Sequence, residues 1–150
     1  VAGRGGRGDA PGRVIIQTFN PEHYALKHAQ SHDYKSFYAE EIEYRQALQY
    51  PPFGRIINVR LSSIKKEALI ARANLIGKQA KKLAARLCGA AEIIGPAESP
   101  LAKIRGHFRY QMLIKGQDVN ALHQIARELL EKHTDSAVKI TVDVDPESFM

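Results

Sequence analysis

Three stretches in the second half of the chain alternate apolar and polar residues, the pattern of a strand with one buried face. They cover residues 57–62, 108–115 and 138–145. A shorter apolar stretch at 92–95 leads into Pro96 and Pro100, and it predicts one more short strand. The second half of the chain therefore predicts four strands.

Between these stretches the apolar residues recur every three or four positions, as on one face of an α-helix. The first helical run ends at Gly89 and contains Leu69, Ala73, Ile76, Ala80, Leu83 and Leu87; the second contains Val119, Leu122, Ala126, Leu129 and Leu130. The order β-α-β-β-α-β is the ferredoxin-like arrangement, whose helices cover one sheet face. We therefore expect an α+β domain over residues 54–150. Its other sheet face would carry Asn58, Arg60, Ser62, Arg109, Gln111, Lys139 and Thr141.

The first third of the chain follows a different pattern. Residues 13–19 form an apolar, β-branched run that predicts a buried strand. Asn20 and Pro21 predict the start of a short helix that ends near Gln30. Asp33 would cap a second helix, which Pro51-Pro52 would stop. We place a domain boundary between residues 53 and 54, with residues 50–54 as a stiff connector.

Charge is distributed unevenly along the chain. The formal net charge is +6, and residues 51–116 hold thirteen basic groups against three acidic ones. Such a block favours a polyanionic partner such as nucleic acid, although lysines that only solvate a long helix give the same count. No stretch has the apolar length of a membrane span, so we expect a cytoplasmic protein without a membrane partner. The single cysteine, Cys88, excludes an internal disulfide, and its apolar setting predicts a core position.

The candidate nucleic-acid ligands fall into two groups. The first is a predicted hairpin with Gly106 at its turn, together with a neighbouring strand; it comprises Lys103, Arg105, His107, Arg109 and Arg60. Such groups suit phosphate contacts, which position rather than specify, and the alternative for Arg109 is an ion pair with Asp143 or Glu43. The second group is Lys78, Lys81 and Lys82 on the long helix, which also carries Lys65, Lys66, Arg72 and Arg86. The alternation assigns Phe108 and Tyr110 to the core rather than to base stacking. His28 and His32 are one helical turn apart and could bind a metal ion together with Asp33. No third strong ligand has the spacing to complete such a site, so we expect no metal site.

The opening residues place Arg4 and Arg7 among glycines, where two guanidinium groups could hold phosphate oxygens. This stretch resembles the last conserved motif of DEAD/DEAH-type helicases without its leading glutamine, as if the chain were cut inside that motif. Further motifs resemble the C-terminal end of the bacterial replication-restart helicases, the primosomal protein N′ family. They are Pro11-Gly-Arg-Val-Ile-Ile-Gln-Thr18, Asn20-Pro-Glu-His23, His32-Asp-Tyr-x-x-Phe-Tyr38, Glu43-x-Arg45, Tyr50-Pro-Pro-Phe-Gly-Arg55 and Asp143-Val-Asp-Pro146.

The resemblance implies an ATP-driven 3′-5′ DNA helicase that acts at abandoned replication forks and supports primosome assembly. Residues 1–53 would be the tail of its second RecA-like lobe, and residues 54–150 a C-terminal domain that binds branched or single-stranded DNA. Arg4 and Arg7 would contact the γ-phosphate of ATP in the intact protein. ATP with Mg²⁺ would bind elsewhere in that protein, and zinc in an upstream region. We therefore expect no cofactor and no ATP hydrolysis in this chain, which lacks a phosphate loop.

The resemblance also implies protein partners, namely single-stranded-DNA-binding protein, the other primosome proteins and the rest of the helicase. Two rival interpretations stay open. The same fold could be an interaction module that docks the helicase core or the acidic tail of single-stranded-DNA-binding protein. It could also be an RNA-binding domain of ribosomal type, although the predicted open sheet face lacks the aromatic residues that stack on bases.

Overall fold

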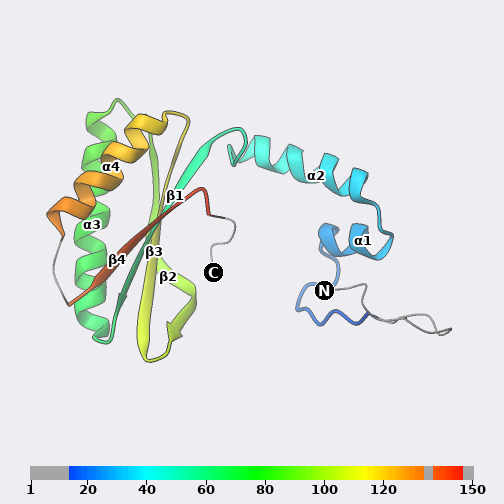
Figure 1. The fold of residues 1–150 in the computed structure, drawn as a ribbon, viewed down its shortest axis with the longest axis horizontal. Helices are drawn as coiled ribbons and strands as arrows, with labels where there is room; N and C mark the ends of the chain where they lie inside the picture. Colours follow the sequence, from blue (N-terminus) through cyan, green and yellow to red (C-terminus); the bar gives the residue numbers. More distant parts are fainter. Residues whose placement is uncertain (1–13, 134–136, 147–150) are drawn as a thin grey trace. The chain divides into compact units, whose positions relative to one another are not determined.

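The computed structural model describes residues 14–133 and 137–146 of the chain (Figure 1). The chain divides into two compact units, residues 1–42 and 43–150. Within the described residues it forms the helices α1 (Tyr24–Gln30), α2 (Tyr34–Ala47), α3 (Lys66–Arg86) and α4 (Val119–Lys132). The strands are β1 (Arg55–Ser63), β2 (Glu92–Ile104), β3 (His107–Gly116) and β4 (Lys139–Val144).

The second unit is built on one antiparallel sheet in the order β2-β3-β1-β4. α3 and α4 pack against each other and against this sheet (Figure 1). The predicted α+β class is confirmed, with both helical runs and the four strands of the second half of the chain. The core between helices and sheet includes Ile57, Val59 and Leu61 of β1, as the alternation of β1 predicted.

The buried stripe of α3 also agrees with its predicted periodicity, whereas that of α4 is rotated. Leu122, Ala126 and Leu129 are buried as expected, but Ile125 lies at the centre of the stripe. Val119 and Leu130 keep 40% and 39% of their surface exposed. Both were predicted as core residues because three- and four-residue steps also connect them to Leu122 and Ala126.

β2 is longer than predicted, because it continues past Pro96 and Pro100 to Ile104. β2 is an edge strand, and a proline at a sheet edge need not break a ladder hydrogen bond. The pairing with β3 shifts register between Ile94 and Ala97 and again between Glu98 and Lys103. These irregularities let the strand carry residues that would have ended an inner strand.

Two further predicted environments in the second unit are wrong. Cys88 is exposed, because α3 ends at Arg86 and Cys88 adopts a left-handed φ of 55° in the turn that follows. Asn58 was placed on an exposed sheet face but is completely buried, since β1 is an inner strand with Leu113 and Asp143 on its neighbours. The amide of Asn58 has no hydrogen-bond partner among the described protein groups.

The first unit contains α1 and the first part of α2. α1 begins at Tyr24 rather than at Pro21, and its cap is His23, whose Nδ1 accepts from the Ala25 N–H at 3.2 Å. Asp33 caps α2 as predicted, accepting from the Ser36 N–H at 3.0 Å. His28 and Glu40, 2.8 Å apart, connect the two helices.

The predicted buried strand before α1 is not formed in the described part of the chain. Residues 14–19 are exposed and have no strand assignment, and Arg13 lies outside the described residues. A strand needs a neighbour that satisfies its backbone groups, and no described segment pairs with this one.

Candidate nucleic-acid interface

The β2–β3 hairpin turns at Arg105 and Gly106, as the sequence predicted. Both residues adopt left-handed φ angles, 48° and 83°, which are the angles of a type I′ two-residue turn. Glycine accepts this conformation at no steric cost, but a residue with a Cβ pays about 1–2 kcal/mol. An exposed arginine therefore occupies a strained position at the end of the hairpin.

The four basic groups of the hairpin do not form one cluster. Lys103 pairs with Phe108 and Ile104 with His107 across the strands. Because paired residues share a sheet face and Phe108 packs against the core, Lys103 lies on the helix side of the hairpin. His107 and Arg109 alternate with Phe108 and lie on the opposite side. Lys103 and these two groups therefore cannot contact the same phosphate.

The cations on the open side of the sheet make contacts within the protein. Arg60 Nη2 donates to Asp143 Oδ2 at 2.6 Å. Asp143 was considered in the sequence as a partner of Arg109, but it pairs with Arg60 instead. Arg60 takes this carboxylate because it lies on β1, directly beside β4. Arg109 instead donates to the backbone carbonyl of Leu101 at 3.4 Å. Of these two arginines, Arg60 is the one whose charge is compensated.

The outer surface of α3 carries the second predicted group, Lys78, Lys81 and Lys82, all of them exposed. Lys78 and Lys82 are one helical turn apart and therefore share a face. Within the described residues, no ion pair involves any of the three lysines. Their charges are available for an anionic partner.

One basic residue of the long helix, Lys66, lies near the hairpin, a position that the sequence did not predict. Lys66 begins α3, at the same end of the sheet as the hairpin turn (Figure 1). Its Nζ lies 5.7 Å from the centroid of the Phe108 ring, and Lys103 Nζ lies 4.6 Å from the same centroid. No local pattern connects Lys66 with Lys103, because the fold brings them together from distant parts of the chain.

A buried histidine at the end of α4 contacts two residues of α3. His133 Nδ1 lies 2.9 Å from Arg72 Nη1, and its Nε2 lies 2.6 Å from Gln79 Oε1. Because arginine can only donate, Nδ1 accepts and Nε2 carries the hydrogen that it donates to Gln79. Burial, together with the positive charges of Arg72 and Lys132, lowers the pKa of His133. The neutral ring is therefore the form that the fold requires.

This arrangement predicts that acid destabilises the domain through His133. The unfolded chain takes up a proton near the ordinary histidine pKa of 6.5, whereas the folded chain resists it until a lower pH. The contribution of His133 should be complete above pH 6.5 and be lost as the pH falls from there toward the lowered pKa. Urea unfolding at pH 5.5 and 7.5 measures this contribution. The difference in free energy of unfolding between the wild-type chain and His133→Gln should be smaller at pH 5.5 than at pH 7.5. An equal difference at both pH values would contradict the neutral form of His133 in the folded chain.

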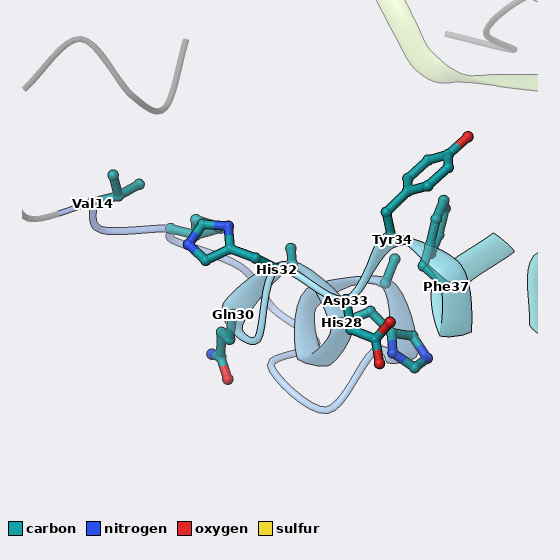
Figure 2. Close-up of a pocket in the computed structure, with 10 residues that line it drawn as sticks. Val14, His28, Gln30, His32, Asp33, Tyr34 and Phe37 are labelled. Carbon is teal, nitrogen blue, oxygen red and sulfur yellow. The ribbon is translucent and has the colours of Figure 1, made fainter.

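The first unit contains a hollow of about 830 Å³ between the segment before α1 and the two helices. Its wall is largely apolar, with Val14, Ile16, Ala25, Ala29 and Phe37 among its residues. In Figure 2 the rings of His28 and His32 lie apart from each other, and the Asp33 carboxylate lies beside His28. The described residues contain no group of three or more His, Cys, Asp or Glu side chains that could hold a metal ion.

Across residues 14–133 and 137–146, no helix is long and apolar enough to cross a membrane.

Two predicted site residues lie outside the described residues. Arg4 and Arg7 belong to the segment 1–13, so their proposed contact with nucleotide stays a prediction.

Comparison with known proteins finds one matching family and several similar full-length proteins. Residues 46–147 match the family described as the primosomal protein N C-terminal domain. The replication restart protein PriA of Bacillus subtilis is 34% identical over 155 residues, which cover all of this chain and 19% of that protein. Its counterpart from Treponema pallidum is 38% identical, covering 97% of this chain and 22% of that protein. The chain thus spans about a fifth of the length of the curated relatives it matches. Among solved structures, the de novo designed protein Foldit4 aligns with a TM-score of 0.49 and 12% identity, over 63% of this chain and 99% of that one.

Proposed function

The chain belongs to the primosomal protein N family, whose C-terminal domain matches residues 46–147, and from this membership we propose that it binds branched or single-stranded DNA. The membership agrees with the resemblance in the motifs. DNA would contact the end of the β2–β3 hairpin and the outer face of α3. Because phosphate contacts dominate such binding, it would be weak, independent of base sequence and strongly dependent on salt.

The observation that carries this proposal is the strained arginine at the end of the hairpin. Arg105 keeps a left-handed backbone that asparagine or glycine would adopt at lower cost. It is exposed, and no ion pair within the described residues involves it. Strain retained at an exposed tip supports a functional role for the side chain. Lys103 next to the turn and Lys78, Lys81 and Lys82 on α3 supply further charge.

We propose the remaining roles for the intact protein. Residues 1–53 would close a RecA-like lobe, with Arg4 and Arg7 on the γ-phosphate of an ATP that the other lobe binds together with Mg²⁺. The sheet domain would have the ferredoxin-like arrangement, which the strand order β2-β3-β1-β4 and both crossover helices support. The intact protein would unwind DNA and assemble with primosome proteins, whereas these 150 residues would hydrolyse no ATP.

A protein-interaction role has one observation in its favour. Ile64, Leu101 and Ile104 are exposed apolar side chains close to the basic end of the hairpin. The acidic tail of single-stranded-DNA-binding protein would find basic side chains there, with apolar side chains beside them. Charge reversal at Arg105 and Arg109 distinguishes the roles, because loss of peptide binding with intact DNA binding would favour the interaction module.

The proposal predicts opposite effects of Arg105→Asn on binding and on stability. Fluorescence anisotropy with a labelled fork at low salt should show binding weaker by about threefold to tenfold. The salt slope, which is the change in log binding constant per unit change in log salt concentration, should be smaller in magnitude by about 1. Urea unfolding should show that the free energy of unfolding rises by about 1 kcal/mol, because asparagine tolerates the left-handed turn.

The matched control is Arg127→Gln, which removes an exposed arginine from α4. It should leave fork binding close to that of the wild-type chain. A flat titration of the wild-type chain at high micromolar protein would refute the DNA-binding proposal. Equal losses in Arg105→Asn and Arg127→Gln would show an effect of net charge rather than a hairpin contact.

A further inference from the structure

Resting on the proposed DNA binding, we propose that Lys66 and Lys103 hold a single backbone phosphate between them, on the helix side of the hairpin. The sequence places Lys66 among the basic residues of the long helix and does not connect it with Lys103 of the hairpin. The two ammonium groups come from the start of α3 and the end of β2, and both lie within 6 Å of the Phe108 ring centroid. They are therefore within roughly 10 Å of each other, about one Debye length at 0.1 M salt.

Phe108 is what positions the pair. Its ring packs against the core, and its strand pairing fixes it opposite Lys103. The face of an aromatic ring attracts ammonium groups, so Phe108 restrains two side chains that would otherwise be flexible. Two ammonium groups gathered on one ring gain more from an anion than either would alone, because both attract it. A phosphodiester oxygen carries the charge that suits this position.

Glu98 is the acidic group that competes for the site. Its Oε1 lies 3.9 Å from Lys66 Nζ, and both side chains are about half exposed, at 48% and 46%. An ion pair that exposed contributes little, so a phosphate can displace it. Removal of the Glu98 charge should therefore strengthen binding.

The Phe108 ring itself would not read the base. Its half-buried ring lies against the core on one side and carries the two lysines, so no open face remains for stacking. His107 and Arg109 lie on the other side of the hairpin and cannot join this phosphate. The site thus contributes affinity without sequence preference.

A salt series on the 150-residue chain tests whether the two lysines share one phosphate. The salt slope of binding counts the phosphates that the protein neutralises, at about 0.9 for each. With a shared phosphate, Lys66→Gln and Lys103→Gln should each weaken fork binding by about threefold to tenfold with little change in slope, because one lysine remains on the phosphate. The double variant should lower the slope by about 0.9. Separate phosphates would lower the slope by about 0.9 in each single variant and by twice that in the double, which would overturn the proposal.

Glu98→Gln tests the same site in the opposite direction. It should bind the fork about threefold more tightly, a gain that partial unfolding cannot produce. In the Lys66→Gln background this gain should disappear. Lys139→Gln, an exposed lysine on β4, is the control and should bind like the wild-type chain. If the wild-type chain binds the fork but Lys66→Gln matches Lys139→Gln, the shared site is wrong while DNA binding stands; without wild-type binding, the proposed function itself fails.

Discussion

Gly77→Ala should destabilise the sheet domain by about 2–3 kcal/mol, although the same change inside a helix usually stabilises it by close to 1 kcal/mol. A Cβ on Gly77 would lie 2.4 Å from Cδ of Pro96 and 3.1 Å from its Cγ. The proline ring is part of the β2 backbone and cannot rotate aside, so α3 would have to move away from the sheet. Urea unfolding followed by far-ultraviolet circular dichroism measures the loss.

Asn74→Ala in the same helix is the control. Residue 74 is exposed, so alanine there improves helix propensity without a steric clash and should raise stability by a few tenths of a kcal/mol. If Gly77→Ala proved as stable as Asn74→Ala, the close packing of α3 on Pro96 would be wrong.

Gly77 also shows what the sequence could and could not predict. The periodicity of α3 identified its buried stripe, because a helix repeats the same face every few residues. The same pattern gave no role to Gly77, which looks like a weak helix residue until β2 is placed against it. Only the three-dimensional structure shows that this contact with Pro96 leaves no room for a side chain.

The candidate site divides in a similar way. The turn at Gly106 is a local property, and the sequence predicted it correctly. The side of the hairpin on which each cation lies depends on the register shift between Glu98 and Lys103, which a proline-containing edge strand hides from simple alternation. The contacts of Lys66 with Phe108 and of Arg60 with Asp143 join distant segments. Such contacts follow from topology, and the sequence pattern carries no direct signal for them.

The predictions of the buried stripe of α4 and of the environment of Cys88 were wrong for a more local reason. A few residues satisfy several helical steps at once, so the stripe could be centred on Ala126 or rotated toward Ile125. Cys88 follows the last turn of α3, where the backbone leaves the helix and the side chain no longer belongs to the apolar face.

Replacing Lys78, Lys81 and Lys82 together by glutamine should weaken fork binding by about tenfold to a hundredfold at low salt. All three lysines are exposed on α3, and no ion pair within the described residues compensates them. If each contacts one phosphate, the salt slope should fall by about 1 for every lysine removed. Anisotropy titrations at four salt concentrations measure both quantities. Glutamine has nearly the same helix propensity as lysine, and all three positions are exposed, so the domain should stay folded.

The control must change the net charge by the same amount, because any basic protein loses affinity for DNA when its charge falls. Lys35, Lys132 and Lys139 are exposed lysines on α2, α4 and β4, and their combined replacement by glutamine provides it. Long-range attraction alone would weaken both triple variants equally, and the lysines of α3 would then only solvate their helix. A loss of fork affinity and a smaller salt slope in the α3 variant alone would show that this face of α3 contacts the DNA backbone. The reason is that the salt slope reports the number of phosphates that the protein neutralises and not its total charge.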